Sequence, residues 1–186
     1  MEVNIRTLDR VNVFGIAAVS GFVATLAVAG LIIIGETIIA FPQGFFYTVM
    51  GKALGVSGMD GMFLGFYLHL LTGTLIGVIA ASPIAVMRRM YRFMGNIVKC
   101  LLYGAVMGSI VWILFYVPIS YTYVVNIVED LPGGSLNVAG KLIKSEEIMG
   151  KFSNIVLSAL GFHIQYGLIY AVITGSFISR RLQLVK

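Results

Sequence analysis

Four stretches of the 186-residue sequence are each long and apolar enough to cross a lipid bilayer. They run over residues 13–41, 61–87, 97–117 and 155–178, and a membrane-spanning helix needs about 20 apolar residues. Hydrophobic residues make up 59% of the chain and charged residues only 11%, which is more apolar surface than a water-soluble fold of this size can bury. The pattern predicts an all-α integral membrane protein with four transmembrane helices in a single membrane domain over residues 1–186.

Two prolines limit these helices. Pro42 follows the first stretch and Pro118 follows the third. A proline inside a helix removes a backbone hydrogen bond and clashes with the preceding turn. We therefore expect the first helix to end at Pro42 and the third to stop or kink at Pro118. Residues 119–153 then form one long outer loop, and a loop of that length more often has a functional role than a short connection does.

Lysine and arginine are distributed unevenly between the two sides of the membrane. Nine of the thirteen lie near the two ends of the chain or within residues 88–99, and four lie in the segments on the opposite side. The positive-inside rule predicts a multi-pass protein of the cell membrane whose two termini are both cytoplasmic. The net charge of +5 does not indicate a nucleic-acid binder, because the basic residues form short clusters between long apolar runs.

An internal repeat is centred on His69 and His163. Small residues recur at every fourth position around each histidine, and aromatic residues follow Pro42 and Pro118 at the same offsets. The repeat predicts two parallel-repeat hairpins, related by an axis along the membrane normal. The small residues are Gly61, Gly65, Gly73 and Gly77 in the second stretch, and Ala159, Gly167, Ala171 and Gly175 in the fourth.

Small residues at this spacing let helices approach closely, so we expect them to pack the second helix on the fourth or on a neighbouring subunit. The histidines have several interpretations, because ionisable side chains inside a membrane are costly and face protein or water. They are structural hydrogen-bonding groups, axial ligands of a b-type haem, members of a metal site, or part of a proton or substrate path. Two histidines leave most metal coordination incomplete, and Glu36 is either a further ligand or a solvated residue at the outer boundary. Close packing of the two helices would leave no slot for a haem between them.

Part of this pattern resembles the small four-helix membrane proteins of the YagU and YqhR type. The resemblance implies a four-helix membrane fold and no particular activity. It rests on the segment Gly21–Thr25, on His69 with Gly73 and Gly77, and on His163 with Gly167 and the Tyr170–Ala171 pair.

The sequence contains no zinc-protease, nucleophile-elbow, dithiol, phosphate-binding or dinucleotide-binding motif, so neither an enzyme nor a cofactor is expected. The favoured hypothesis is a non-catalytic accessory subunit of a larger membrane protein complex, such as an energy-converting oxidase or monooxygenase assembly. Its partners are then other membrane protein subunits and the lipid bilayer. The alternatives are a membrane electron carrier that binds haem b through His69 and His163, and a small transporter built from parallel repeats.

Overall fold

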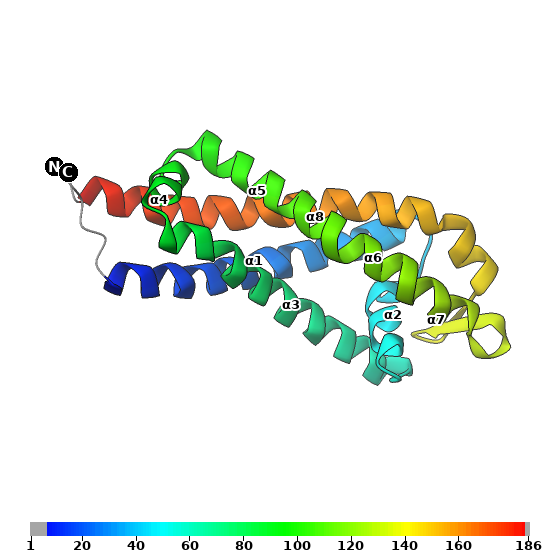
Figure 1. Cartoon of the computed structure of the whole chain (residues 1–186). Helices are drawn as coiled ribbons and strands as arrows, with labels where there is room; N and C mark the ends of the chain where they lie inside the picture. Colours follow the sequence, from blue (N-terminus) through cyan, green and yellow to red (C-terminus); the bar gives the residue numbers. More distant parts are fainter. Residues whose placement is uncertain (1–6, 185–186) are drawn as a thin grey trace. The chain divides into compact units, whose positions relative to one another are not determined.

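A computed structural model describes the backbone of residues 7–184 (Figure 1). Four helical stretches are long and apolar enough to cross a membrane, which confirms this part of the predicted fold. They are Asn12–Ile38, Gly58–Val86, Ile97–Glu129 and Ser145–Gln183. All long elements of the described chain are therefore helices, as in a multi-pass membrane protein. The described residues also contain one short β-hairpin.

The first two spans are continuous helices, α1 (Thr7–Ile38) and α3 (Gly58–Val86). Between them lies a short helix, α2 (Phe45–Ala53). After α3, a second short helix, α4 (Arg88–Met94), leads into α5 (Ile97–Val111). The helix α1 ends at Ile38, a few residues before Pro42, and the backbone turns at Ala40, whose φ is 61°.

The third span continues through Pro118, where the sequence analysis expected it to stop or kink. Two π-helical segments, Trp112–Tyr116 and Ser120–Val124, flank α6 (Val117–Ile119), and α7 (Val125–Glu129) completes the span. A π turn shifts the hydrogen-bond register by one residue, so the missing N–H of Pro118 and its ring are accommodated without ending the helix.

The expected outer loop at residues 119–153 is largely structured. Helical turns continue to Glu129, and a 3₁₀ turn at Pro132–Gly134 follows. The strands β1 (Ser135–Val138) and β2 (Lys141–Lys144) then pair antiparallel, with Leu136 opposite Ile143. Ala139 and Gly140 join the strands with φ values of 48° and 87°, and positive φ at both central residues is the geometry of a tight hairpin. The fourth span, α8 (Ser145–Leu184), begins directly after β2.

The chain packs as two compact units, and each of the four spans contributes one part to each unit. The first unit takes its described residues from Met1–Ala27, Leu70–Ser109 and His163–Lys186. The second unit consists of Val28–His69 and Ile110–Phe162.

In the first unit, α3 lies closely against α1. A Cβ added to Gly21 would lie 3.1 Å from the carbonyl oxygen of Gly73 and 3.3 Å from the Cα of Gly77. The helix α8 reaches the same backbone through two tyrosines: Tyr166 donates a 2.6 Å hydrogen bond to the Gly73 carbonyl, and Tyr170 a 2.9 Å bond to that of Gly77. The closest backbone approach of these two glycines is therefore to α1, and bulky tyrosines fill the space towards α8.

The small residues of α8 in the first unit lie against α5 instead. Added Cβ atoms at Gly104 and Gly167 would each meet the backbone of the other glycine. Ala171 is fully buried, and its carbonyl accepts a 2.7 Å hydrogen bond from the Cys100 thiol. At Gly175 an added Cβ would lie 3.2 Å from the Cβ of Cys100. In this unit the ridge of α8 thus packs on the helix that precedes it in its own hairpin.

The second unit contains a folded head, which we define as residues 39–57 and 125–150. Within it, α2 lies beside α7 (Figure 1). The head has its own hydrophobic core, to which α2, α7, both strands and the first turn of α8 contribute. Its buried members are Phe41, Phe45, Val49, Val128, Leu131, Leu136, Val138, Ile143 and Ile148.

Candidate functional site

The structure places His69 among aromatic side chains of the second unit. Its imidazole lies 5.7 Å from the ring centroid of Phe46, with the two rings nearly perpendicular, and 5.7 Å from that of Tyr47. His163 belongs to the first unit, where its backbone carbonyl faces Gly108 of α5. Both histidines are half-buried, but their surroundings differ in kind.

The surroundings of His69 are aromatic. The rings of Phe46 and Tyr47 both pack on its imidazole. The two surface hollows of the second unit described below are lined by neither histidine. Among the residues that the structure describes, no three His, Cys, Asp or Glu side chains converge as metal ligands would.

Glu36 is buried, with 4% of its surface exposed, although the sequence analysis considered it a solvated residue or a metal ligand. Its two carboxylate oxygens accept hydrogen bonds from the backbone N–H groups of Gly44 at 2.7 Å and Phe46 at 2.8 Å. These groups lie at the N-terminus of α2, which has no side-chain cap from its own N-cap residue, Gly44. Glu36 therefore serves as a cap supplied by α1, in line with the preference of helix N-termini for negative charge.

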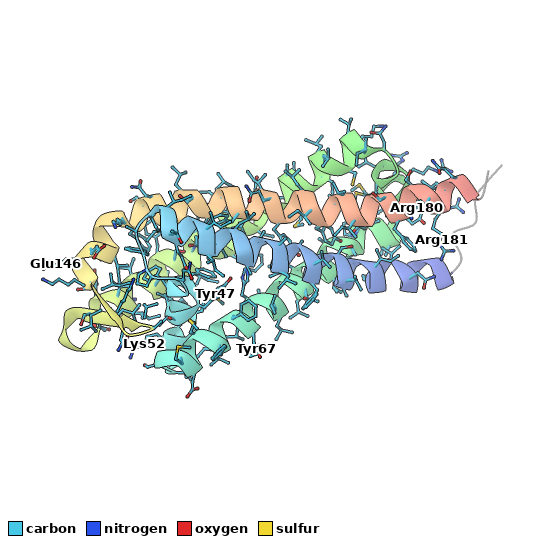
Figure 2. The ribbon with its side chains drawn as sticks, turned by 180° about the vertical axis from the view of Figure 1, so that it is seen from behind. Tyr47, Lys52, Tyr67, Glu146, Arg180 and Arg181 are labelled. Carbon is cyan, nitrogen blue, oxygen red and sulfur yellow. The ribbon has the colours of Figure 1, made fainter. Side chains whose placement is uncertain are left out.

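Tyr47 follows directly in α2 and points into the second unit (Figure 2). It is 3% exposed, and its ring lies edge-on to Phe66 at 5.4 Å. Its hydroxyl oxygen is buried and has no hydrogen-bond partner among the described residues. Burial, with a smaller contribution from the Glu36 carboxylate, raises the pKa of this hydroxyl above its usual value.

Glycines allow α2 to lie this close to α3. A Cβ at Gly65 would overlap the backbone of Tyr47, and one at Gly51 would overlap the backbone of Gly61. Gly61 and Gly65, two of the small residues that the sequence analysis singled out, thus contact α2, whereas Ala159 is buried elsewhere in the second unit. No sequence motif identified Tyr47 as buried, because the approach depends on glycines in two separate segments.

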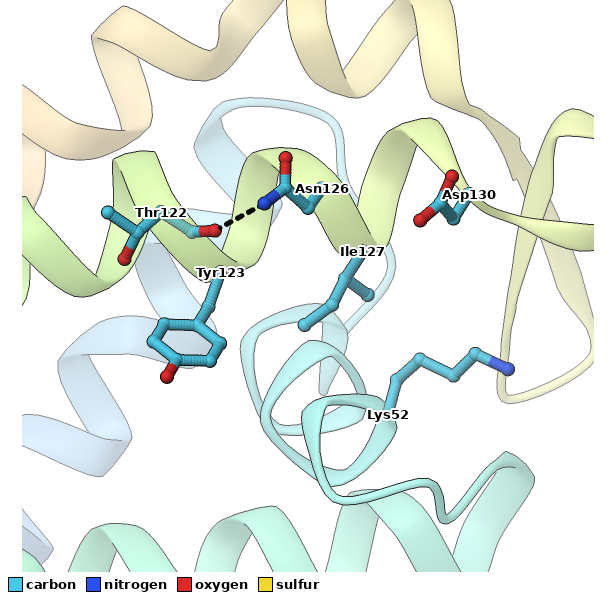
Figure 3. Close-up of a pocket in the computed structure, with 6 residues that line it drawn as sticks. All are labelled: Lys52, Thr122, Tyr123, Asn126, Ile127 and Asp130. Carbon is cyan, nitrogen blue, oxygen red and sulfur yellow. Dashed lines mark hydrogen bonds between the residues drawn. The ribbon is translucent and has the colours of Figure 1, made fainter.

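A concave feature with side chains of both charges lies between α2 and the end of the third span, and we call it the α2–α7 hollow (Figure 3). It has a volume of about 290 Å³. Lys52 extends from α2 on one side, and Asp130, directly after α7, lies on the other. Its lining residues are Lys52, Thr122, Tyr123, Asn126, Ile127 and Asp130.

Internal hydrogen bonds hold part of this lining in place. The Asn126 amide donates a 2.7 Å bond to the backbone carbonyl of Thr122, one turn earlier (Figure 3). The Lys52 ammonium donates a 3.3 Å bond to the hydroxyl of Ser57. Among the described residues, neither Lys52 nor Asp130 forms an ion pair, so two opposite charges flank the hollow without neutralising each other.

A second hollow, of about 340 Å³, lies at the turn after α1. It is lined by Thr37, Ala40, Phe41, Pro42, Gln43 and Lys141. It has one cationic side chain and no anionic one, so its lining is less suited to a ligand with two charges. Next to it, the Lys151 ammonium donates a 3.0 Å hydrogen bond to the Ile39 carbonyl and lies 4.7 Å from the ring centroid of Phe41.

Comparison with known proteins found no relative of this chain. No protein-family model matches the chain, and no curated protein or solved structure matches it either.

Proposed function

We propose that the protein is a non-catalytic subunit of a larger membrane protein assembly, for which an energy-converting oxidase or monooxygenase is one example. In this proposal both termini and the segment 88–99 lie in the cytoplasm, because nine of the thirteen Lys and Arg residues belong to these parts. The head then lies on the opposite side of the membrane, where it is accessible to a partner.

The folded head is the observation that carries this proposal. A connection between two spans needs only a few residues, whereas here two connections form a helix and a hairpin and share a core of nine buried hydrophobic side chains. The head presents charged side chains around that core, including the exposed Lys141, Lys144 and Glu146. A rigid, charged surface is suited to the specific recognition of another protein.

The distribution of glycines gives further support. The small residues around the two histidines contact other parts of the chain, whereas five other helical glycines (Gly15, Gly30, Gly58, Gly150 and Gly161) are exposed and have no atom within 4 Å of an added Cβ. Three of them lie well inside the spans. Gly15 and Gly30 are on α1, and Gly161 is on α8. Exposed glycines on membrane spans are positions at which a helix of another chain can approach closely.

The parallel-repeat arrangement is retained as part of the proposal. It is supported by the contacts in the first unit, where the small residues of α3 lie against α1 and those of α8 lie against α5. Each histidine-bearing helix thus packs on the helix that precedes it in its own hairpin. In this proposal the two hairpins share the same internal packing, and their outer faces are available to a partner.

The test is extraction of the full chain from its native membrane in a mild detergent, followed by native electrophoresis and mass spectrometry. We expect a complex of defined mass that contains other membrane proteins. Gly30→Leu should weaken this complex, because the larger side chain would keep a helix of the partner away from α1. Ile79→Leu, at a position of α3 that is 69% exposed, is the matched control and should leave the complex intact. Migration of the wild-type protein at its monomer mass under these conditions would contradict the proposal.

A further inference from the structure

We propose that the α2–α7 hollow binds the headgroup of a phospholipid with a primary ammonium group, of the phosphatidylethanolamine type. The ligand's phosphate is placed at Lys52 and its ammonium at Asp130. This inference is independent of the proposed role as a subunit, since it concerns a lipid site within one chain.

The charges of the hollow set the ligand's chemistry. Lys52 and Asp130 flank it from different elements, and the described residues supply no counter-ion to either (Figure 3). A ligand with one negative and one positive group satisfies both side chains at once. A carboxylate accepts hydrogen bonds, so a primary ammonium, which has three N–H donors, is preferred over a trimethylated one.

In this proposal the hollow lies at the depth of a lipid headgroup, because it is at the end of the third candidate span. The third candidate span ends at Glu129, and Asp130 is the next residue. Tyr123, one to two turns earlier, is 64% exposed, and exposed tyrosines are typical of the membrane–water interface. Lys52 lies in α2, between the first and second candidate spans.

An apolar strip leads away from the hollow along the same span. Tyr123, Ile119 and Phe115 follow one another at intervals of four residues, and all three are more than half exposed. Residues four apart lie on one face of a helix, so an acyl chain can follow this strip once the headgroup occupies the hollow. The volume of about 290 Å³ is at the lower end for ligand sites, which suits a headgroup rather than a whole lipid.

The experiment is native mass spectrometry of the full chain, purified in detergent and titrated with short-chain lipids. The probes are phosphatidylethanolamine, phosphatidylcholine, phosphatidylglycerol and soluble phosphoethanolamine. We expect phosphatidylethanolamine to be retained most strongly. Lys52→Met and Asp130→Asn should each reduce its retention about tenfold, the size expected for the loss of one charge-assisted hydrogen bond.

Two matched controls change the same charges elsewhere on the head. Lys144→Met and Glu146→Gln lie outside the hollow and should keep wild-type retention. Helical circular dichroism of every variant verifies that it is folded, and the exchange variant Lys52→Asp with Asp130→Lys should recover part of the binding.

Three results would overturn the proposal. Equal retention of the three lipids would remove the headgroup specificity, and wild-type retention by Lys52→Met and Asp130→Asn would place the lipid elsewhere. Competition by soluble phosphoethanolamine at the same concentration as the lipid would assign the hollow to a soluble ligand.

Discussion

The carboxylate of Glu36 accepts a 2.7 Å hydrogen bond from the backbone N–H of Gly44, and this contact joins the end of α1 to the start of α2. Phe46 donates to the other oxygen of the same carboxylate, so two backbone donors of α2 depend on one buried side chain. Since Gly44 has no side chain to cap the helix itself, the position of α2 rests on Glu36.

Glu36→Gln should therefore destabilise the second unit by about 1–3 kcal/mol, because an amide retains one acceptor oxygen and presents an N–H₂ group to the second donor. The measurement is the free energy of unfolding in mixed micelles. Thr37→Val, at the neighbouring exposed position, is the control and should have a smaller effect. Equal stability of Glu36→Gln and wild type would show that α2 is held by its apolar contacts alone.

Gly73→Ala tests the contact between α3 and α1. The new methyl group would lie 2.8 Å from the Cγ2 atom of Thr25, a side chain that is itself buried. We expect a loss of about 1–3 kcal/mol in the free energy of unfolding, as for other overpacked sites. The double variant Gly73→Ala with Thr25→Ala should recover part of this loss, because it removes the Oγ1 and Cγ2 atoms of Thr25, although the Cβ of residue 25 still lies 2.9 Å from the new methyl group.

Gly30→Ala is the matched control for this experiment. Its added Cβ meets nothing within 4 Å, and alanine is the better helix former, so the change should be neutral or slightly stabilising. A loss at Gly30→Ala as large as that at Gly73→Ala would show that helix propensity or lipid contact, and not the α1–α3 contact, causes the effect.

The extent to which the sequence predicts this structure depends on how local the signal is. The four spans follow from continuous apolar runs, which specify a helix without reference to any other segment. The continuation of the third helix through Pro118 does not follow from such a local signal, because it depends on where two π turns form relative to the proline. The hairpin was also missed, since its turn is Ala139–Gly140 and not one of the usual Asn-Gly or Asp-Gly pairs.

The candidate site was harder to predict than the fold. Lys52 and Asp130 resemble ordinary loop charges in the sequence, and they line the same hollow only because α2 lies beside α7. The burial of Glu36 could have been anticipated in part, because the N-cap residue of α2 is a glycine and the N-terminus of this helix needs an acceptor from elsewhere. The small residues around the histidines were identified from their spacing, but spacing does not specify which helix lies opposite.

Tyr166→Phe and Tyr170→Phe test the link between α8 and α3. Each removes one hydrogen bond to a glycine carbonyl, and interhelical hydrogen bonds in membranes average about 0.6 kcal/mol. We expect a loss of that order for each variant and about twice as much for the double variant, measured as the free energy of unfolding. Tyr67→Phe, at a position that is 65% exposed, should have no effect. A neutral double variant would contradict a stabilising role for these hydroxyls.

Tyr47 should make the stability of the second unit fall at high pH. Its pKa is raised in the folded state by burial and by the Glu36 carboxylate, whereas in the unfolded chain it ionises near pH 10. Above about pH 10 the unfolded state therefore loses a proton that the folded state keeps, and the free energy of unfolding decreases as pH rises further. Below that pH this group contributes no pH dependence. Tyr47→Phe should remove this part of the slope between pH 10 and 12, while Tyr67→Phe should retain it. Equal slopes for wild type and Tyr47→Phe would show that the Tyr47 hydroxyl reaches water in the folded protein.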